Sequence, residues 1–150
     1  MTTRTYQLFT DGACLGNPGP GGWASILREA DGSDVIRTGG EPSSTNNRME
    51  LLAVIDALES LPEPSRVTIC SDSEYVLQGL SEWMSGWKAK GWKKAVGKTV
   101  MNLDLWQRLE GQSSRHQLTT HWVKGHAGHP ENERVDFLAN TEAQRWAHSS

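Results

Sequence analysis

Apolar and polar positions alternate over much of the first forty residues, which is typical of β-strands. The alternation predicts strands over 5–11, 23–28 and 35–38. Glycines and prolines over 16–22 predict a tight connection between the first two strands, and residues 30–34 turn the chain before the third. Because no helix separates these strands, we expect an antiparallel meander.

After Pro42 the apolar spacing becomes helical. Leu51, Ile55 and Leu58 share one face of a helix predicted over 47–61, which Pro62 and Pro64 end. The remaining predicted elements are a strand over 66–71, helices over 74–84 and 103–109, a strand over 118–123, and a last helix over 131–147 that Pro130 begins. Alternating strands and helices imply parallel strands. We therefore expect an α/β fold: a mixed five-stranded sheet, three antiparallel strands then two parallel ones, with helices on both faces.

Length and composition narrow the class of protein. The 150 residues suit one domain, expected over 1–150, and 36% hydrophobic with 22% charged residues argues against a disordered chain. No stretch approaches the roughly 20 apolar residues of a membrane span, and no signal peptide is visible at the N-terminus. Two cysteines, Cys14 and Cys70, make no disulfide framework. We expect a cytoplasmic monomer with no obligate protein partner.

Four acidic residues fall where α/β folds place ligands. Asp11 and Asp72 follow predicted strands, so in parallel neighbours they would meet at the carboxyl edge of the sheet. Glu50 lies in the first turn of the long helix and Asp136 in the second turn of the last one. Each has an alternative interpretation: Asp11 a turn residue, Glu50 a capping partner of Asn47, Asp72 a helix N-cap and Asp136 a solvated residue.

The segments around these acids resemble bacterial type 1 ribonuclease H. The segments are FTDGACLGNPGPGG (9–22), TNNRME (45–50), SDSEY (71–75), NLDLW (102–106) and WVKGHAGHPENERVD (122–136). They occur in the family's order, and the match runs from about residue 5 to about residue 147. The resemblance implies an endonuclease that hydrolyses the RNA strand of RNA–DNA hybrids and leaves 5′-phosphate and 3′-hydroxyl ends.

The resemblance also implies a metal site. It identifies Asp11, Glu50, Asp72 and Asp136 as catalytic ligands of two Mg²⁺ ions, with Mn²⁺ a possible substitute, and Asp11 as the shared ligand. Hard oxygen ligands suit Mg²⁺, and four clustered carboxylates without a cation would repel one another and raise at least one pKa. His126, between two glycines, is expected to assist proton transfer or product departure. A zinc site on His121, His126 and His129 is disfavoured, because the spacing is not standard and no cysteine joins them.

One segment is positively charged, although the net charge of the whole chain is −3. Residues 83–103, called the basic segment below, hold five lysines and no acid, together with Trp83, Trp87 and Trp92. Such a segment favours contact with phosphates, although a solvated lysine face over packed tryptophans is the alternative. By resemblance it grips the DNA strand; we expect Trp83 to contact the hybrid and Trp87 and Trp92 to pack.

Further hybrid contacts follow from the resemblance alone. The expected substrate-binding residues are Cys14, Asn17, Thr45, Asn46, Asn47, Ser73, Glu74, Trp83, Lys88, Lys90, Lys93 and Lys94. Glu74 departs from the family's usual Gln and can accept but not donate a hydrogen bond, and Gly86 replaces a common Asn. Two other functions stay open: a noncatalytic hybrid-binding module of the same fold, and the nuclease part of a larger polymerase.

Overall fold

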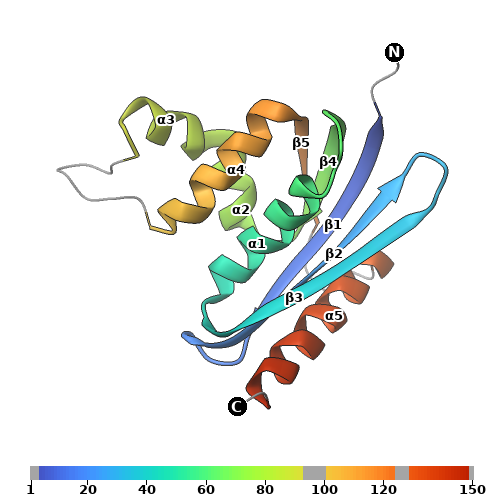
Figure 1. Cartoon of the computed structure of the whole chain (residues 1–150), viewed down its shortest axis with the longest axis vertical. Helices are drawn as coiled ribbons and strands as arrows, with labels where there is room; N and C mark the ends of the chain where they lie inside the picture. The colour runs from blue at the N-terminus through green and yellow to red at the C-terminus, as the bar shows by residue number, and fades with distance from the viewer. Residues whose placement is uncertain (1–3, 93–100, 124–128, 149–150) are drawn as a thin grey trace.

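A mixed sheet of five strands forms the centre of the protein (Figure 1). The structure is a computed structural model, and it describes residues 4–92, 101–123 and 129–148. The strands, in the sheet order β3-β2-β1-β4-β5, are β1 (Thr5–Cys14), β2 (Gly19–Glu29), β3 (Asp34–Ser44), β4 (Arg66–Ser71) and β5 (Gln117–Trp122). β1, β2 and β3 pair antiparallel, whereas β4 pairs parallel with both β1 and β5. The predicted antiparallel meander followed by parallel strands is confirmed.

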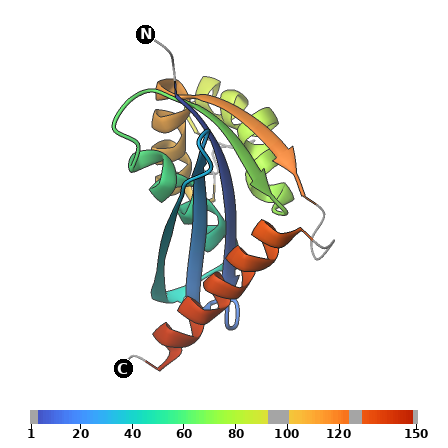
Figure 2. The same cartoon turned by 90° about the vertical axis from the view of Figure 1, so that its right-hand side faces the viewer.

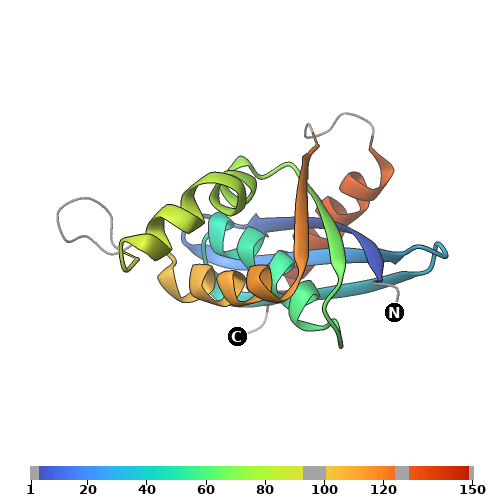
Figure 3. The same cartoon turned by 90° about the horizontal axis from the view of Figure 1, so that it is seen from above.

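Helices cover both faces of this sheet (Figure 2). On one face lie α1 (Asn46–Glu59), α2 (Glu74–Gln78), the π-helix η1 (Gly79–Trp83), α3 (Met84–Ala89) and α4 (Leu103–Arg115). The other face carries α5 (Pro130–Ala147), which Pro130 begins as predicted. Seen from above, α3 extends beyond the sheet (Figure 3). In the part of the chain that the structure describes, no helix has the length and apolar character needed to cross a membrane.

Each face of the sheet has its own hydrophobic core. The larger core lies under α1 and α4, and it includes the fully buried side chains of Leu8, Ile55 and Trp106. The smaller core lies under α5 and joins Ile26 of β2 to Val135. Burial of these apolar side chains is the main force that holds the helices on the sheet. The strand ends between the two cores are therefore rigidly placed.

The strands of the meander are longer than the pattern predicted. β1 continues past Asp11 to Cys14, β2 begins at Gly19 instead of residue 23, and β3 runs on from residue 38 to Ser44. Of the glycines predicted to form a connection, Gly19, Gly21 and Gly22 instead pair with β3, Gly22 with Gly40. Cross-strand hydrogen bonds on both sides support residues whose own strand propensity is low. A register irregularity lies between Gly19 and Gly21.

The segment predicted as one helix over 74–84 is not a single α-helix in the structure. It is divided into α2, η1 and α3 and continues to Ala89. The backbone of Gly79, where the π-helical turn begins, lies directly against the ring of Trp106. A π-turn inserts one residue without ending the helix, so apolar spacing alone did not reveal it. α4 likewise extends past the predicted residue 109 to Arg115.

Candidate metal centre

Two of the four acids meet because β1 and β4 are parallel neighbours. Their register pairs Phe9 with Cys70, and Asp11 and Asp72 each follow two residues later. Side chains two residues apart in a strand share a face, so Asp11 continues the face of Phe9, and Asp72 directly follows Ser71, the last residue of β4. Asp11 lies inside β1 and is 4% exposed, so its interpretation as a turn residue is wrong.

Glu50 reaches the same place from the first turns of α1. The helix begins after Thr45, whose side chain accepts a hydrogen bond from the Arg48 backbone N–H. Gly12 of β1 lies under this turn: a Cβ there would lie 2.5 Å from the Glu50 backbone nitrogen. Only glycine lets helix and strand approach so closely, and the Glu50 carboxylate is thereby buried beside Asp11. Because Thr45 is the cap, the alternative interpretation of Glu50 as a capping partner of Asn47 is wrong.

The three carboxylates form a compact group. Asp11, Glu50 and Asp72 each offer an oxygen atom, and these oxygens lie within 4.8 Å of one another. Glu50 Oε2 is buried and has no hydrogen-bond partner among the described residues. A buried carboxylate oxygen without a partner is costly unless a cation binds it. The residues present therefore fit a hard divalent metal ion.

Electrostatics within the group agree with this fit. Burial, with the charge of Asp72 and the nearby Asp136 adding to it, raises the pKa of Asp11 to about 8. Burial and the charges of Asp11 and Asp72 raise the pKa of Glu50 well above its usual value. The raised pKa predicted for clustered carboxylates is confirmed. Without a cation the cluster holds protons near neutral pH, which is the expected behaviour of an empty cation site.

Asp136 stands beside this group and not within it. It is half-buried on α5, and its carboxyl lies within hydrogen-bonding reach of Asp11. Asn140, one turn further along the helix, donates its side-chain amide to the Asp136 carboxylate at 3.3 Å. The sequence analysis missed Asn140, although its i, i+4 spacing from Asp136 was a usable signal. Asp11 is thus the carboxyl with neighbours on both sides.

Several of the residues expected to bind the hybrid surround the end of β1. Cys14 is half-buried and its thiol contacts the carbonyls of Gly19 and Ser44, each at 3.3 Å. Asn17 and Asn46 are exposed and adjacent, since Asn17 Oδ1 accepts from the Asn46 backbone N–H at 3.2 Å. The exposed Asn47 follows Asn46 on α1.

The start of α2 places two more of the expected contacts. Ser73 caps the helix through its hydroxyl, which accepts from the Val76 backbone N–H, so the alternative of Asp72 as the N-cap is wrong. Glu74 is exposed in the first turn.

The basic segment is described only in part. Trp83 is half-buried, and its ring lies 5.7 Å from that of Trp87 and 6.2 Å from that of Tyr75. Trp87 and Trp92 pack against the larger core, as predicted. Lys88 is exposed but forms an ion pair with Glu110 of α4 at 2.6 Å, and Lys90 is exposed. Lys93, Lys94 and His126 lie outside the described residues.

The zinc alternative is not supported by the one histidine of its set with described contacts. The Nδ1 atom of His129 accepts a hydrogen bond from the Asn132 backbone N–H at 3.2 Å, which caps α5. His121 is exposed on β5. Among the described residues, the group able to hold a metal ion is that of Asp11, Glu50 and Asp72.

Comparison with known proteins gives a consistent result. The family model of RNase H matches residues 3–144. A ribonuclease H of Ruegeria sp. (strain TM1040) is 58% identical over 135 residues, covering 87% of this chain and 86% of its own length. The ribonuclease H of Agrobacterium fabrum is 58% identical over 136 residues, covering 91% of this chain and 92% of its own.

Solved structures agree on the fold. LC9-RNase H1, a type 1 RNase H with the type 2 active-site motif, superposes with a TM-score of 0.86 at 35% identity, over 98% of this chain and 75% of its own. LC11-RNase H1 in complex with an RNA/DNA hybrid superposes with a TM-score of 0.72 at 21% identity, over 93% of this chain and 97% of its own. Because the relatives are named for catalysis and the clustered acids are in place, a noncatalytic module is not favoured. The chain therefore belongs to the ribonuclease H family, the divalent-metal-dependent hydrolases that cut the RNA strand of RNA–DNA hybrids.

Proposed function

We propose that this protein hydrolyses the RNA strand of RNA–DNA hybrids with two Mg²⁺ ions held by its own four acids, leaving 5′-phosphate and 3′-hydroxyl ends. The observation that carries the proposal is the group of three carboxylates whose oxygens lie within 4.8 Å of one another, one of them with a buried oxygen that has no hydrogen-bond partner among the residues that the structure describes. When bound, the ions supply activation of the attacking water and stabilisation of the charge on the phosphate and the leaving oxygen. Mn²⁺ is the expected substitute.

Each acid has a distinct role in this proposal. Asp11 would serve both ions, because it has carboxyl neighbours on both sides. Glu50 and Asp72 would help to hold one ion and Asp136 the other, and the Asn140 amide would orient the Asp136 carboxylate. Asp11 must release its proton before it can act as a ligand, since its pKa is raised to about 8 in the absence of a cation.

The substrate surface extends from the carboxylates over the neighbouring loops and helices. Asn17, Asn46 and Asn47 present exposed amides beside the end of β1, where donors and acceptors suit the 2′-hydroxyl and base edges of a shallow minor groove. LC11-RNase H1, which has this fold, was solved with a hybrid bound.

The remaining roles complete the proposed machinery. Cys14 and Thr45 contact the hybrid near the amides, and Ser73 and Glu74 contact it from the start of α2, next to Asp72. The lysines of the basic segment contact the DNA phosphates together with Trp83, and His126 assists proton transfer. Cys14 and Cys70 are free thiols, as suits a monomer in the reducing cytoplasm.

The test uses labelled RNA–DNA, RNA–RNA and DNA–DNA duplexes with and without Mg²⁺. We expect cleavage of the hybrid's RNA strand alone, and only with the metal present. Asp11→Asn and Asp72→Asn should each abolish cleavage with the fold intact, whereas Asp31→Asn in the exposed β2–β3 turn serves as the matched control. Normal turnover by either active-site variant would overturn the assigned roles. Tight hybrid binding by the wild type without any cleavage would instead favour the noncatalytic module.

A further inference from the structure

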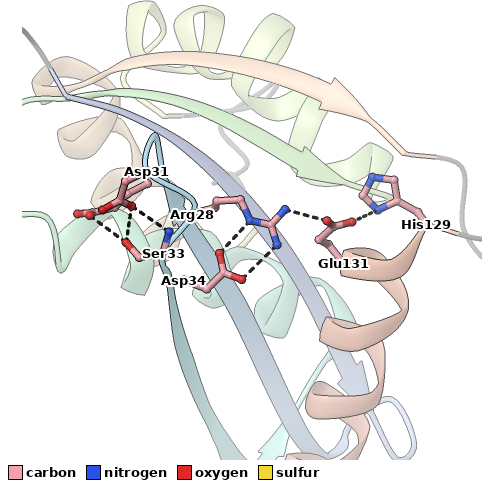
Figure 4. A network of polar contacts seen from close by, with 7 residues as sticks. Arg28, Asp31, Ser33, Asp34, His129 and Glu131 are labelled. Atoms are coloured by element: carbon pink, nitrogen blue, oxygen red, sulfur yellow. Dashed lines mark hydrogen bonds and ion pairs between the residues drawn. The ribbon is translucent and has the colours of Figure 1, made fainter.

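Arg28 of β2 occupies a position that the proposed chemistry leaves unexplained. Its guanidinium donates to Asp34, the first residue of β3, from Nε at 2.8 Å and from Nη2 at 3.1 Å. Its Nη1 donates to Glu131 in the first turn of α5 at 2.8 Å. Figure 4 shows the guanidinium between these two carboxylates. One side chain thus joins two strands of the sheet to the start of the helix on its face.

The same guanidinium also contacts the strand that carries Asp11. Its central carbon lies 5.3 Å from the centre of the Phe9 ring, and Phe9 precedes Asp11 by two residues on the same face of β1. Asp136 follows Glu131 by five residues, about 7.5 Å along the axis of α5. Arg28 therefore contacts both Phe9, which precedes Asp11, and Glu131, which precedes Asp136. The carboxyls of Asp11 and Asp136 must lie at a fixed separation.

We propose that Arg28 is a positioning residue that holds the N-terminal half of α5 against the sheet and thereby sets the position of Asp136 relative to Asp11. This inference rests on the proposed role of Asp136 as a metal ligand.

The other half of α5 is fixed by close packing. A Cβ at Gly22 of β2 would collide with the backbone of Ala139 and Ala143, so the helix lies directly on the strand there. In the N-terminal half, Val135 packs in the smaller core, and the His129 ring lies 5.7 Å from the Phe9 ring. These apolar contacts have no fixed direction, whereas the Arg28–Glu131 hydrogen bond has one, and Asp136 lies between that bond and the close contact at Gly22.

Charges around Arg28 make the contact more than a surface ion pair. The side chains of Arg28, Asp34 and Glu131 are 29%, 23% and 24% exposed. Hydrogen bonds from Arg28 lower the pKa of both Asp34 and Glu131, so both stay ionised throughout the neutral range. The charge of Arg134 on α5 also acts on Asp34. A planar fork that donates to both partners is specific to arginine, so lysine cannot fully replace it.

Glu131 has two possible partners near the start of α5, namely His129 and Arg28. Its Nδ1 lies 3.5 Å from Glu131 Oε2, but the same atom accepts from the Asn132 backbone N–H. An atom that accepts this hydrogen bond cannot also donate to Glu131. The anchor of Glu131 is therefore Arg28, and His129 acts as the cap.

The test measures Mn²⁺ binding to the metal-free protein by calorimetry, with hybrid cleavage as a second readout. Arg28→Met and Glu131→Met should each weaken Mn²⁺ binding about tenfold, and the double variant no further, because both remove the hydrogen bond between Arg28 and Glu131. The kcat should fall while the KM for the hybrid stays unchanged, and Arg28→Lys should be intermediate. Arg108→Met is the matched control: it breaks an Arg–Glu pair between α4 and α1 and should leave Mn²⁺ binding unchanged.

Two further results separate the possible failures. Wild-type Mn²⁺ affinity in Arg28→Met and Glu131→Met, even with a lower melting temperature, would overturn the positioning role. Should Arg28→Met not fold, Glu131→Met and Arg28→Lys decide the question by the same measurement. If Asp136→Asn itself leaves Mn²⁺ binding and cleavage unchanged, the proposed role of Asp136 fails instead.

Discussion

Replacing Asp11 by Asn is expected to stabilise the metal-free protein at neutral pH while abolishing its activity. Asp11 keeps a proton in the folded chain up to a pH of about 8, whereas the unfolded chain releases it near pH 3.8. Between these values the folded state binds more protons, so the free energy of unfolding falls as the pH rises. Asn carries no charge to repel Glu50 and Asp72, and its oxygen can still accept from the Gly12 backbone N–H, which lies 2.9 Å from Asp11 Oδ1.

The magnitude follows from the width of that pH window. Each pH unit is worth about 1.4 kcal/mol for one fully displaced proton, so about three units up to pH 7 set an upper limit of about 4 kcal/mol. Asp11 shares its proton with the neighbouring carboxyls, which also titrate in the variant. We therefore expect a gain of about 2 to 4 kcal/mol at pH 7, and a pH dependence in the variant that is clearly shallower than in the wild type.

Urea denaturation in EDTA at pH 5, 6, 7 and 8 measures the effect. Mg²⁺ at about 10 mM, roughly ten times the Kd of a weak site, should raise the free energy of unfolding of the wild type at pH 8. It should leave that of Asp11→Asn unchanged. Asp31→Asn is the control, because Ser33 lowers the pKa of Asp31 and removing its charge should bring no gain. A wild-type pH slope in Asp11→Asn would refute the argument that Asp11 carries the proton of the cluster.

Three other predictions concern the rest of the molecule. Alanine at the four lysines from 88 to 94 in the basic segment should raise the KM for the hybrid and flatten its salt dependence with little change in kcat; an unchanged KM across salt concentrations would count against that surface. Gly111→Ala, in open space on α4, should raise the free energy of unfolding by about 1 kcal/mol in urea, whereas Gly79→Ala should lower it because its methyl meets the ring of Trp106. Burial lowers the pKa of His116, so its stabilising effect is lost as the pH falls below 6.5. The stability gap between wild type and His116→Gln should therefore narrow from pH 7.5 to pH 5; a constant gap would show that His116 has the same pKa in the folded and unfolded chains.

The architecture could be predicted from the sequence because apolar spacing reports elements one at a time. Strand–helix alternation predicts parallel strands in the second half, and the structure adds the parallel pairing of β1 with β4, which brings Asp11 and Asp72 to one edge. What the pattern could not give was where each strand ends. The pattern predicts a connection at Gly22, yet Gly22 pairs with Gly40 of β3, since a strand's neighbours and not its own composition decide whether it continues.

The candidate site shows the same division at the level of single side chains. The choice between Glu50 as a cap and Glu50 as a ligand could not be made within α1, because both alternatives fit the local spacing. It was decided by a residue far away in the chain: Gly12 admits the first turn of α1 against β1, and Thr45 takes the capping position.

The role of Arg28 could not be predicted from the sequence for a related reason. Its partners Asp34 and Glu131 are 6 and 103 residues away, so no local pattern links them. The sequence thus predicts which residue types form a site at the edge of a sheet. Contacts between helices and strands set the geometry of that site. Variants of Arg28 and Glu131 test this geometry, whereas variants of the four acids test which residues form the site.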